Sequence, residues 1–131
     1  MRAKQTILVV DDEERVRQLI HSFLMEDYDV LLAADGLEAM GCYELHAGRI
    51  AAVITDVQMP RVNGRELVEW LHRRRPQLPV IVVSGRTGGE VEHLLLRRGV
   101  VWLEKPFEVK VLVSTLKRML ETQKEGRRAG H

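Results

Sequence analysis

Short apolar runs alternate along the chain with longer segments in which apolar residues recur every three or four positions. The runs are rich in Val, Ile and Leu and contain no charged residue, which is typical of strands buried on both faces of a sheet. We therefore predict five β-strands. They cover residues 6–10, 30–33, 51–55, 80–83 and 100–103.

The segments that follow these strands carry the period of amphipathic helices. After the first strand, apolar side chains fall at the i, i+3, i+4, i+7 and i+8 positions counted from Val16. Asp35 and Asn63 each precede a glutamate by three residues, which is the spacing of a helix N-cap. The predicted helices cover residues 16–24, 37–46, 64–75, 90–98 and 108–121.

The repeated alternation of strand and helix predicts a (βα)5 fold of the α/β class, with a parallel sheet covered by helices on both faces. We expect the flavodoxin-like doubly wound arrangement of five strands, in the order 2-1-3-4-5. Ligands of such sheets bind at the carboxyl ends of the strands, beside the point where the strand order reverses, here between the first and third strands. In this interpretation residues 1–122 form one domain and residues 123–131 a polar, basic tail or linker.

Composition limits the function classes open to this chain. Its 131 residues fit one soluble domain, with 45% hydrophobic and 30% charged residues and a formal net charge of +1. This balance gives no bulk attraction to nucleic acid or membranes, and the apolar runs are too short to cross a bilayer. Cys42 is the single cysteine, which excludes an internal disulfide and a multi-cysteine metal site. We expect a cytoplasmic protein that contacts neither DNA nor membranes directly.

Side chains suited to metal and phosphate chemistry stand where the predicted strands end. Asp11 and Asp12 follow the first strand, Asp56 the third, Ser84 the fourth and Lys105 the fifth. Three neighbouring carboxylates repel one another in a partly dry site, and a bound divalent cation would relieve this repulsion. Oxygen ligands without histidine or cysteine favour a hard ion such as Mg²⁺. A Mg²⁺ ion beside a lysine is a recurrent arrangement for handling a phosphoryl group.

Two of these side chains are candidate nucleophiles for phosphoryl transfer. Ser84 has no histidine or other base near it in the pattern, whereas Asp56 is already ionised and can form an acyl phosphate directly. Asp56 also lies between the Asp11–Asp12 side and the Ser84–Lys105 side of the predicted sheet edge. The pattern therefore favours Asp56 as the nucleophile.

Taken together and in this order, the motifs resemble those of receiver domains in two-component response regulators. The resemblance extends over about residues 5–121, which is nearly the whole chain. Each motif alone is weak, but four in order at strand ends form a specific set. They are Asp11-Asp12, the segment DVQMPRVNG at 56–64, Ser84-Gly85 and Lys105-Pro106-Phe107.

The resemblance implies a phosphoacceptor and a magnesium site. Asp56 would accept the phosphoryl group. Asp12 and Asp56 would bind Mg²⁺ directly, Asp11 would act largely through water, and the backbone carbonyl of Gln58 would be a further ligand.

The resemblance also implies a switch around the phosphoryl group. Lys105 would pair with the phosphoryl oxygens, Ser84 would hydrogen-bond one of them, and the Lys105–Pro106 peptide bond is expected to be cis. Trp102 stands where the family usually has Tyr or Phe, whose rings move between exposed and buried positions. Trp102 would either take part in this switch, with its bulk opposing a full inward swing, or serve as a partly buried core aromatic.

The partners implied are proteins. A sensor histidine kinase or a phosphotransfer protein would supply the phosphoryl group. A downstream protein or a second copy of the chain would bind the surface formed by helices 90–98 and 108–121 and strand 100–103. The domain would not be an enzyme beyond its own phosphorylation and slow dephosphorylation. It would be either a stand-alone regulator or a receiver from a larger regulator or hybrid kinase.

Two alternatives from other classes stay open. The first is a Mg²⁺-dependent phosphatase-like enzyme, which commonly carries an Asp-x-Asp motif and a cap insertion, whereas the acids here are adjacent and no insertion is present. The second is a protein-interaction module independent of phosphorylation. Such a module usually lacks one of the acids or the lysine, and none is missing here.

Overall fold

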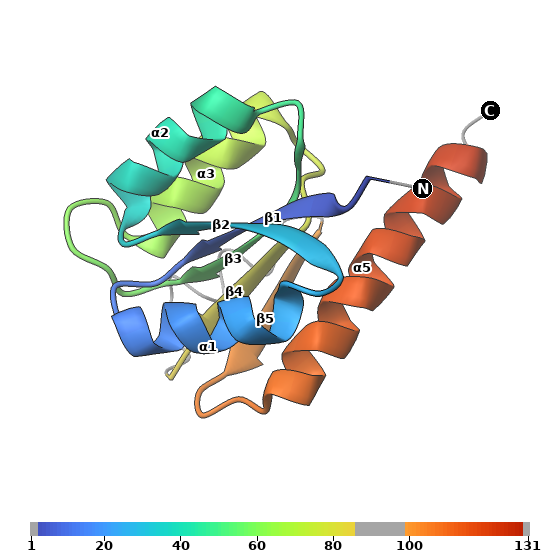
Figure 1. Cartoon of the computed structure of the whole chain (residues 1–131). Coiled ribbons are helices and arrows are strands. Elements are labelled where there is room, and N and C mark those ends of the chain that lie inside the picture. Colours follow the sequence, from blue (N-terminus) through green and yellow to red (C-terminus); the bar gives the residue numbers. More distant parts are fainter. Residues whose placement is uncertain (1–2, 86–98, 130–131) are drawn as a thin grey trace.

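The computed structural model describes residues 3–85 and 99–129, with side chains as far as residue 123. Five parallel strands form one sheet in the order β2-β1-β3-β4-β5, as the sequence predicts (Figure 1). Parallel strands align their carboxyl ends on the same edge of the sheet, so the loops that follow them meet there. The strands are β1 (Gln5–Val10), β2 (Tyr28–Ala33), β3 (Ile50–Asp56), β4 (Val80–Ser84) and β5 (Val100–Glu104).

Helices cover both faces of the sheet. In Figure 1, α2 and α3 lie on one face and α1 and α5 on the other. The helix predicted at 90–98 lies outside the described residues. Within the described ranges, 3–85 and 99–129, no helix has the length and apolar character needed to span a membrane. The helices are α1 (Glu14–Leu24), α2 (Gly36–His46), α3 (Gly64–Arg74) and α5 (Val109–Ala129).

The edge strand β2 starts two residues earlier than predicted. Tyr28 and Asp29 pair with Gln5 and Thr6 of β1 in continuous register. Asp29 is exposed, because one face of an edge strand can remain open to solvent. Tyr28 and Asp29 therefore belong to the strand, which the apolar run predicted to start only at Val30.

The last helix ends eight residues later than predicted, and it includes most of the segment from residue 123 onward that was expected to be a polar, basic tail or linker. The structure continues α5 through Ala129. Beyond Leu120 the one apolar residue in the sequence is Ala129, so the apolar periodicity ends before the helix does. The residues beyond are mostly strong helix formers with no proline among them. The domain boundary at residue 122 remains a prediction.

Two apolar clusters hold the sheet between its helices. Strands β1, β3 and β4 are buried on both faces, as their continuous apolar sequences predict. Leu8 and Val53 point into the cluster that also holds Leu67 of α3. Ile7 points into the opposite cluster, which holds Leu112 of α5. The central strands are therefore fixed from both sides, and the positions of their carboxyl ends are fixed with them.

Gly64 lets α3 begin directly beside the end of β3. Its backbone N–H donates to the carbonyl of Val57 over 2.8 Å. A Cβ atom at this position would clash with the carbonyl oxygen of Asp56 and would lie 2.7 Å from the Cα of Val57. Because both obstacles are backbone atoms, no side-chain movement could make room.

An ion pair ties the loop after β3 to the start of α2. Asp35 caps α2 by accepting a 2.8 Å hydrogen bond from the N–H of Glu38. Its other carboxylate oxygen accepts hydrogen bonds from Arg61, with Nε at 2.9 Å and Nη2 also in contact. Arg61 has a φ of 67°, a left-handed conformation that is unfavourable for a residue with a side chain. The pair therefore stabilises the loop in a strained conformation.

We predict opposite effects for two glycine-to-alanine substitutions. Gly64→Ala should lower the free energy of unfolding by about 1–3 kcal/mol through overpacking. Gly41→Ala is the matched control, because a Cβ on this helical residue meets nothing within 4 Å. It should raise the free energy of unfolding by about 1 kcal/mol. Urea unfolding of both variants measures the difference, and equal effects would contradict the close approach at Gly64.

The Asp35–Arg61 pair should make stability depend on pH. Burial alone would raise the pKa of Asp35, but the N–H of Glu38 and the guanidinium of Arg61 hold the pKa below its ordinary value. The stabilisation is thus present above about pH 4, the unfolded pKa, and is lost as the pH falls through the folded pKa. Asp35→Asn keeps the N-cap but not the charge. It should cost up to about 1 kcal/mol at pH 6 and less at pH 3, and a pH-independent difference in urea unfolding would refute this.

Candidate functional site

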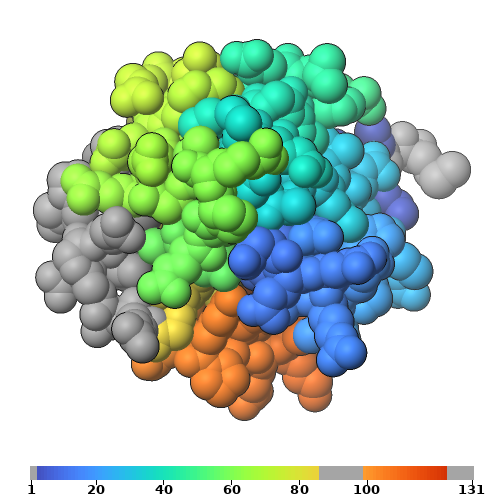
Figure 2. Space-filling view, turned by 90° about the vertical axis from the view of Figure 1, so that its left-hand side faces the viewer, coloured from blue at the N-terminus to red at the C-terminus, as the bar shows by residue number. Residues whose placement is uncertain are grey.

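Segments far apart in sequence meet at the carboxyl edge of the sheet. Figure 2 views this edge, where the blue start of α1, the green loop after β3, the yellow end of β4 and the orange segment after β5 lie together. Asp56 and Ser84 end β3 and β4, while Asp11 and Lys105 directly follow β1 and β5. The structure therefore gathers the residues that the sequence places at strand ends.

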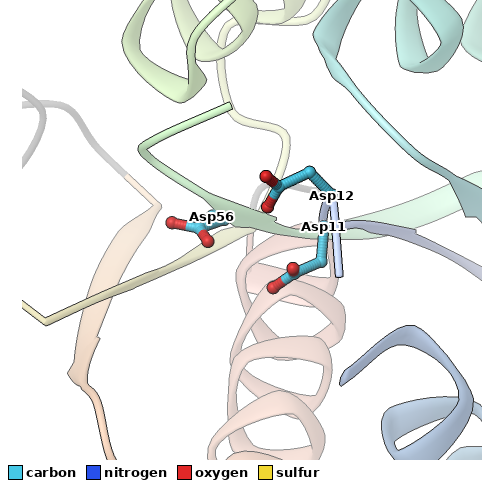
Figure 3. Close-up of side chains that lie close together, drawn as sticks. All are labelled: Asp11, Asp12 and Asp56. Carbon is cyan, nitrogen blue, oxygen red and sulfur yellow. The ribbon is translucent and has the colours of Figure 1, made fainter. Parts of the chain in front are cut away.

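Three carboxylates form the centre of this edge. Each of Asp11, Asp12 and Asp56 offers a carboxylate oxygen, and these three atoms lie within 4.8 Å of one another (Figure 3). Asp11 and Asp56 are 2% and 7% exposed, whereas Asp12 is exposed. All the donors are oxygens, and one side of the cluster is open to solvent. This set fits a hard, partly hydrated cation such as Mg²⁺.

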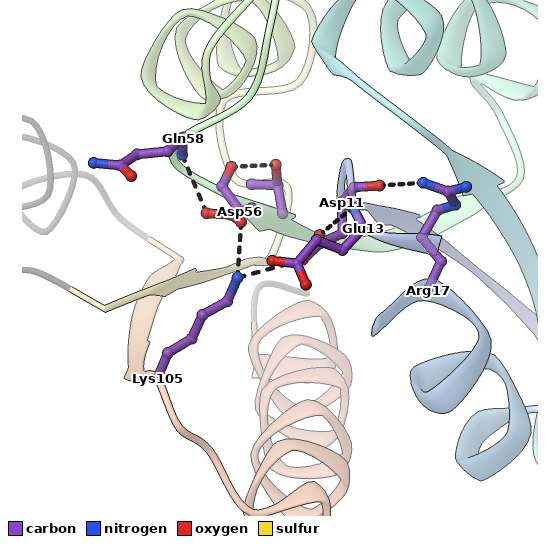
Figure 4. Close-up of polar contacts among 7 residues, drawn as sticks. Asp11, Glu13, Arg17, Asp56, Gln58 and Lys105 are labelled. Carbon is purple, nitrogen blue, oxygen red and sulfur yellow. Dashed lines mark hydrogen bonds and ion pairs between the residues drawn. The ribbon is translucent and has the colours of Figure 1, made fainter. Parts of the chain in front are cut away.

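Lys105 connects two of the carboxylates. Its Nζ donates to Oδ2 of Asp56 over 2.8 Å and lies 3.6 Å from Oδ2 of Asp11 (Figure 4). Burial alone would lower the pKa of Lys105, but the hydrogen bond and charge of Asp56 and the charge of Asp11 raise it above its ordinary value. The side chain therefore remains a cation that faces the carboxylates.

Asp11 is held in place on its other side. Its Oδ1 accepts a 2.9 Å hydrogen bond from the N–H of Glu13, and its backbone carbonyl accepts a 2.6 Å hydrogen bond from Arg17 (Figure 4). Burial raises the pKa of Asp11 above its ordinary value, while the N–H of Glu13 and the ammonium of Lys105 offset part of this effect. The charges of Asp56 and Asp12 raise it further. Burial and the neighbouring carboxylates therefore disfavour the ionised form of Asp11.

Backbone contacts orient Asp56. Its Oδ1 accepts a 3.1 Å hydrogen bond from the N–H of Gln58. Its backbone carbonyl accepts a 2.8 Å hydrogen bond from Thr55 Oγ1 (Figure 4). The Gln58 side chain is exposed and points away from Asp56, so this residue contacts the carboxylate through its backbone (Figure 4). The side chain of Asp56 is therefore aimed at the cluster before any ligand binds.

The predicted switch residues line the β4–β5 side. Ser84 is buried, and its carbonyl accepts a 2.9 Å hydrogen bond from the N–H of Lys105. The Lys105–Pro106 peptide bond is cis, as the resemblance implied. Trp102 is partly buried against the core cluster that includes α3 residues. Its Nε1 is buried and has no hydrogen-bond partner among the residues that the structure describes.

Sequence reasoning missed the residues that support the site. Arg17 and Arg61 bind a backbone carbonyl and the carboxylate that caps α2, respectively. Arg17 lies in the first turns of a helix that follows two acidic residues, and this position only weakly indicates a contact with the site. No pattern reveals the left-handed backbone of Arg61, since arginine rarely adopts it.

Comparison with known proteins identifies the family. The family model of the response regulator receiver domain matches residues 7–117. The chain is 35% identical over 120 residues to the sensor kinase CckA of Brucella abortus, which covers 90% of this chain and 13% of CckA. It is 34% identical over 120 residues to the response regulator MprA of Mycobacterium avium, covering 90% of this chain and 52% of MprA. The chain thus spans about half, or less, of these curated relatives.

Solved structures agree with this relationship. The receiver domain of the hybrid histidine kinase CckA aligns with a TM-score of 0.75 at 35% identity, covering 88% of this chain and 98% of that domain. The chemotaxis protein CheY4 of Vibrio cholerae aligns with a TM-score of 0.78 at 30% identity, covering 89% of this chain and 99% of CheY4. With this fold and with acids and a lysine gathered at its carboxyl edge, the chain belongs to the response regulator receiver domain family of two-component signalling systems.

Proposed function

We propose that Asp56 accepts a phosphoryl group from a phosphohistidine of a sensor histidine kinase or of a phosphotransfer protein. A carboxylate oxygen of Asp56 attacks phosphorus, the phosphorus–nitrogen bond breaks, and the neutral imidazole departs with a proton from solvent. The observation that carries this proposal is the 2.8 Å contact between Lys105 Nζ and Asp56 Oδ2. It places a cation where the transferred oxygens would carry charge, which is what phosphoryl transfer requires.

The acidic cluster supports a Mg²⁺ requirement for this step. Asp12, Asp56 and the backbone carbonyl of Gln58 would bind the ion directly, and Asp11 would act largely through water. Bound Mg²⁺ neutralises charge on the carboxylates and on the incoming phosphoryl group. Asp11 is held by Glu13 and Arg17, so its position would not depend on the ion.

We further propose that phosphorylation redistributes the contacts of Lys105 and Ser84. The phosphoryl oxygens would take over the ammonium of Lys105 and accept a hydrogen bond from the Ser84 hydroxyl. Lys105 directly follows β5, so its movement would shift the population of β5 conformations. Trp102 lies three residues away on that strand. Its indole N–H has no partner among the described residues, and its reorientation would break no hydrogen bond within that part of the chain.

The output would be a binding surface and not a catalysed reaction on a separate substrate. The family is a signalling family. We propose that β5, α5 and residues 90–98 form a surface for a downstream protein or a second copy of the chain, without direct contacts to DNA. A cytoplasmic location fits the histidine kinase partner. The only chemistry expected of the domain is its own phosphorylation and slow dephosphorylation.

The direct test is intact-mass measurement after incubation with Mg²⁺ and either acetyl phosphate or phosphoramidate. The wild-type protein should gain a single phosphoryl group. Asp56→Asn, which keeps the side-chain shape but loses the nucleophile, should gain none, and removal of Mg²⁺ with EDTA should prevent labelling of the wild type.

Labelling of folded Asp56→Asn would show a different acceptor. Folded, Mg²⁺-loaded wild-type protein that neither donor nor a panel of phosphorylated histidine kinases can label would favour the phosphorylation-independent module. Turnover of a small phosphate ester would favour the phosphatase-like alternative.

A further inference from the structure

A hollow opens at the edge of the sheet opposite the carboxylates, where the strands begin. It has a volume of about 710 Å³ and lies between the middle of α5, the segment before β4 and the start of β5. In Figure 1 the strands begin at the right-hand edge of the sheet. Pro79, Val100 and Met119 give it an apolar wall. Its size and mixed lining are those of a small-molecule site.

Among the residues that the structure describes, the charged side chains lining this hollow are all positive. Arg75 and Arg118 line it, and among the described residues no carboxylate does. A neighbouring hollow of about 410 Å³ shares Arg75 and Gln123 and adds Arg49, again with no acid in its lining. Three guanidinium groups thus face two adjoining hollows, so the local potential attracts anions. This is the reverse of the acidic carboxyl edge.

One side of the hollow is built from fixed side chains. Arg75 Nη1 donates to the carbonyl of Ile50. Gln123 Nε2 donates to the carbonyl of Gln77 over 3.1 Å and so ties α5 to the segment before β4. Arg118 differs from these, because it is exposed and has no hydrogen-bond or ion-pair partner within the described part of the chain. Its donors are available to a ligand without loss of an existing bond.

We propose that this hollow binds a small organic phosphate with a planar, apolar body, of the nucleoside monophosphate class. The planar fork of a guanidinium group matches phosphate oxygens, so Arg75 and Arg118 would take the phosphate. The ring would lie against Val100 and Met119, and the amide of Gln77 could hydrogen-bond its polar edge. An anion without an apolar ring would make no use of the contacts that the apolar wall offers, so we expect a ligand that carries both groups.

The ligand would act on the elements proposed for output. Val100 and Val101 belong to β5, and Arg118, Met119 and Gln123 belong to α5. A bound phosphate would therefore brace these two elements at the end opposite Asp56. This inference goes beyond the proposed phosphorylation and stands or falls separately from it, because binding requires neither Asp56 nor Mg²⁺.

The test is an NMR titration of the ¹⁵N-labelled full chain with AMP, at constant ionic strength and without Mg²⁺. Saturable amide shifts are expected at Gly99, Val100 and Thr122, which belong to the hollow. Arg118→Ala should weaken binding about tenfold, the effect of losing one charge-assisted contact. Lys110→Ala is the matched control. It removes the same charge from an exposed position in the first turn of the same helix and should leave affinity unchanged.

Adenosine and inorganic phosphate are the control ligands, because each lacks one of the two parts of AMP that the hollow is proposed to bind. Both should bind more weakly than AMP if the phosphate and the ring each contribute. Adenosine as tight as AMP would overturn the role of the arginines, and inorganic phosphate as tight as AMP would overturn the role of the apolar wall. Absence of saturable shifts with AMP, or equal losses in Arg118→Ala and Lys110→Ala, would overturn the proposal as a whole.

Discussion

Repulsion among three carboxylates at the edge of the sheet is the constraint on which the site depends. Asp11, Asp12 and Asp56 offer oxygens within 4.8 Å of one another, where each pair of full charges repels by about 3 kcal/mol at an effective dielectric constant of about 20. Lys105 offsets only part of this charge, through its contacts with Asp56 and Asp11. The folded chain therefore maintains an excess of negative charge that a divalent cation would neutralise.

The fold supplies the rigidity that keeps this charge concentrated. Strand β1, which Asp11 directly follows, and strand β3, which Asp56 ends, both lie inside the sheet and are packed from both faces. Gly64 allows α3 to start against the backbone of Asp56, and the Asp35–Arg61 pair holds the intervening loop to α2. Relaxation that would separate the carboxylates is thus opposed by buried packing. In the proposed mechanism, charge added at Asp56 would instead act on Lys105, which contacts Asp56, and through it on β5.

Much of this arrangement could be predicted from sequence, because the carboxyl ends of parallel strands all lie at the same edge of a sheet. Apolar runs locate the strands, and side chains at or just after strand ends meet at one edge, so the sequence alone brings together Asp56 and Lys105, which are 49 positions apart. The exact ends of elements were less accessible. The length of α5 beyond Leu120 depends on helix propensity without burial, and the start of β2 depends on the tolerance of an edge strand for polar residues.

Features that depend on three-dimensional detail were not predictable. The left-handed conformation of Arg61 follows from its contact with Asp35, which is distant in sequence. The basic hollow is lined by Arg75, which directly follows α3, and by Arg118 of α5, and these two segments share no motif. Both involve arginines, whose long side chains leave little trace in hydrophobic periodicity. Sequence patterns thus located the acidic edge of the molecule but not the basic one.

The measurement that tests the electrostatic account most directly is the thermal unfolding midpoint as a function of Mg²⁺ at constant ionic strength. The wild-type midpoint should rise saturably, since a ligand at about ten times its dissociation constant adds about 1.4 kcal/mol of stability. Asp12→Asn alters an exposed acid. It should unfold at a higher temperature than the wild type without Mg²⁺, because repulsion is relieved, and should respond less to the ion. A wild-type midpoint insensitive to Mg²⁺, or an equal response in Asp12→Asn, would contradict the account.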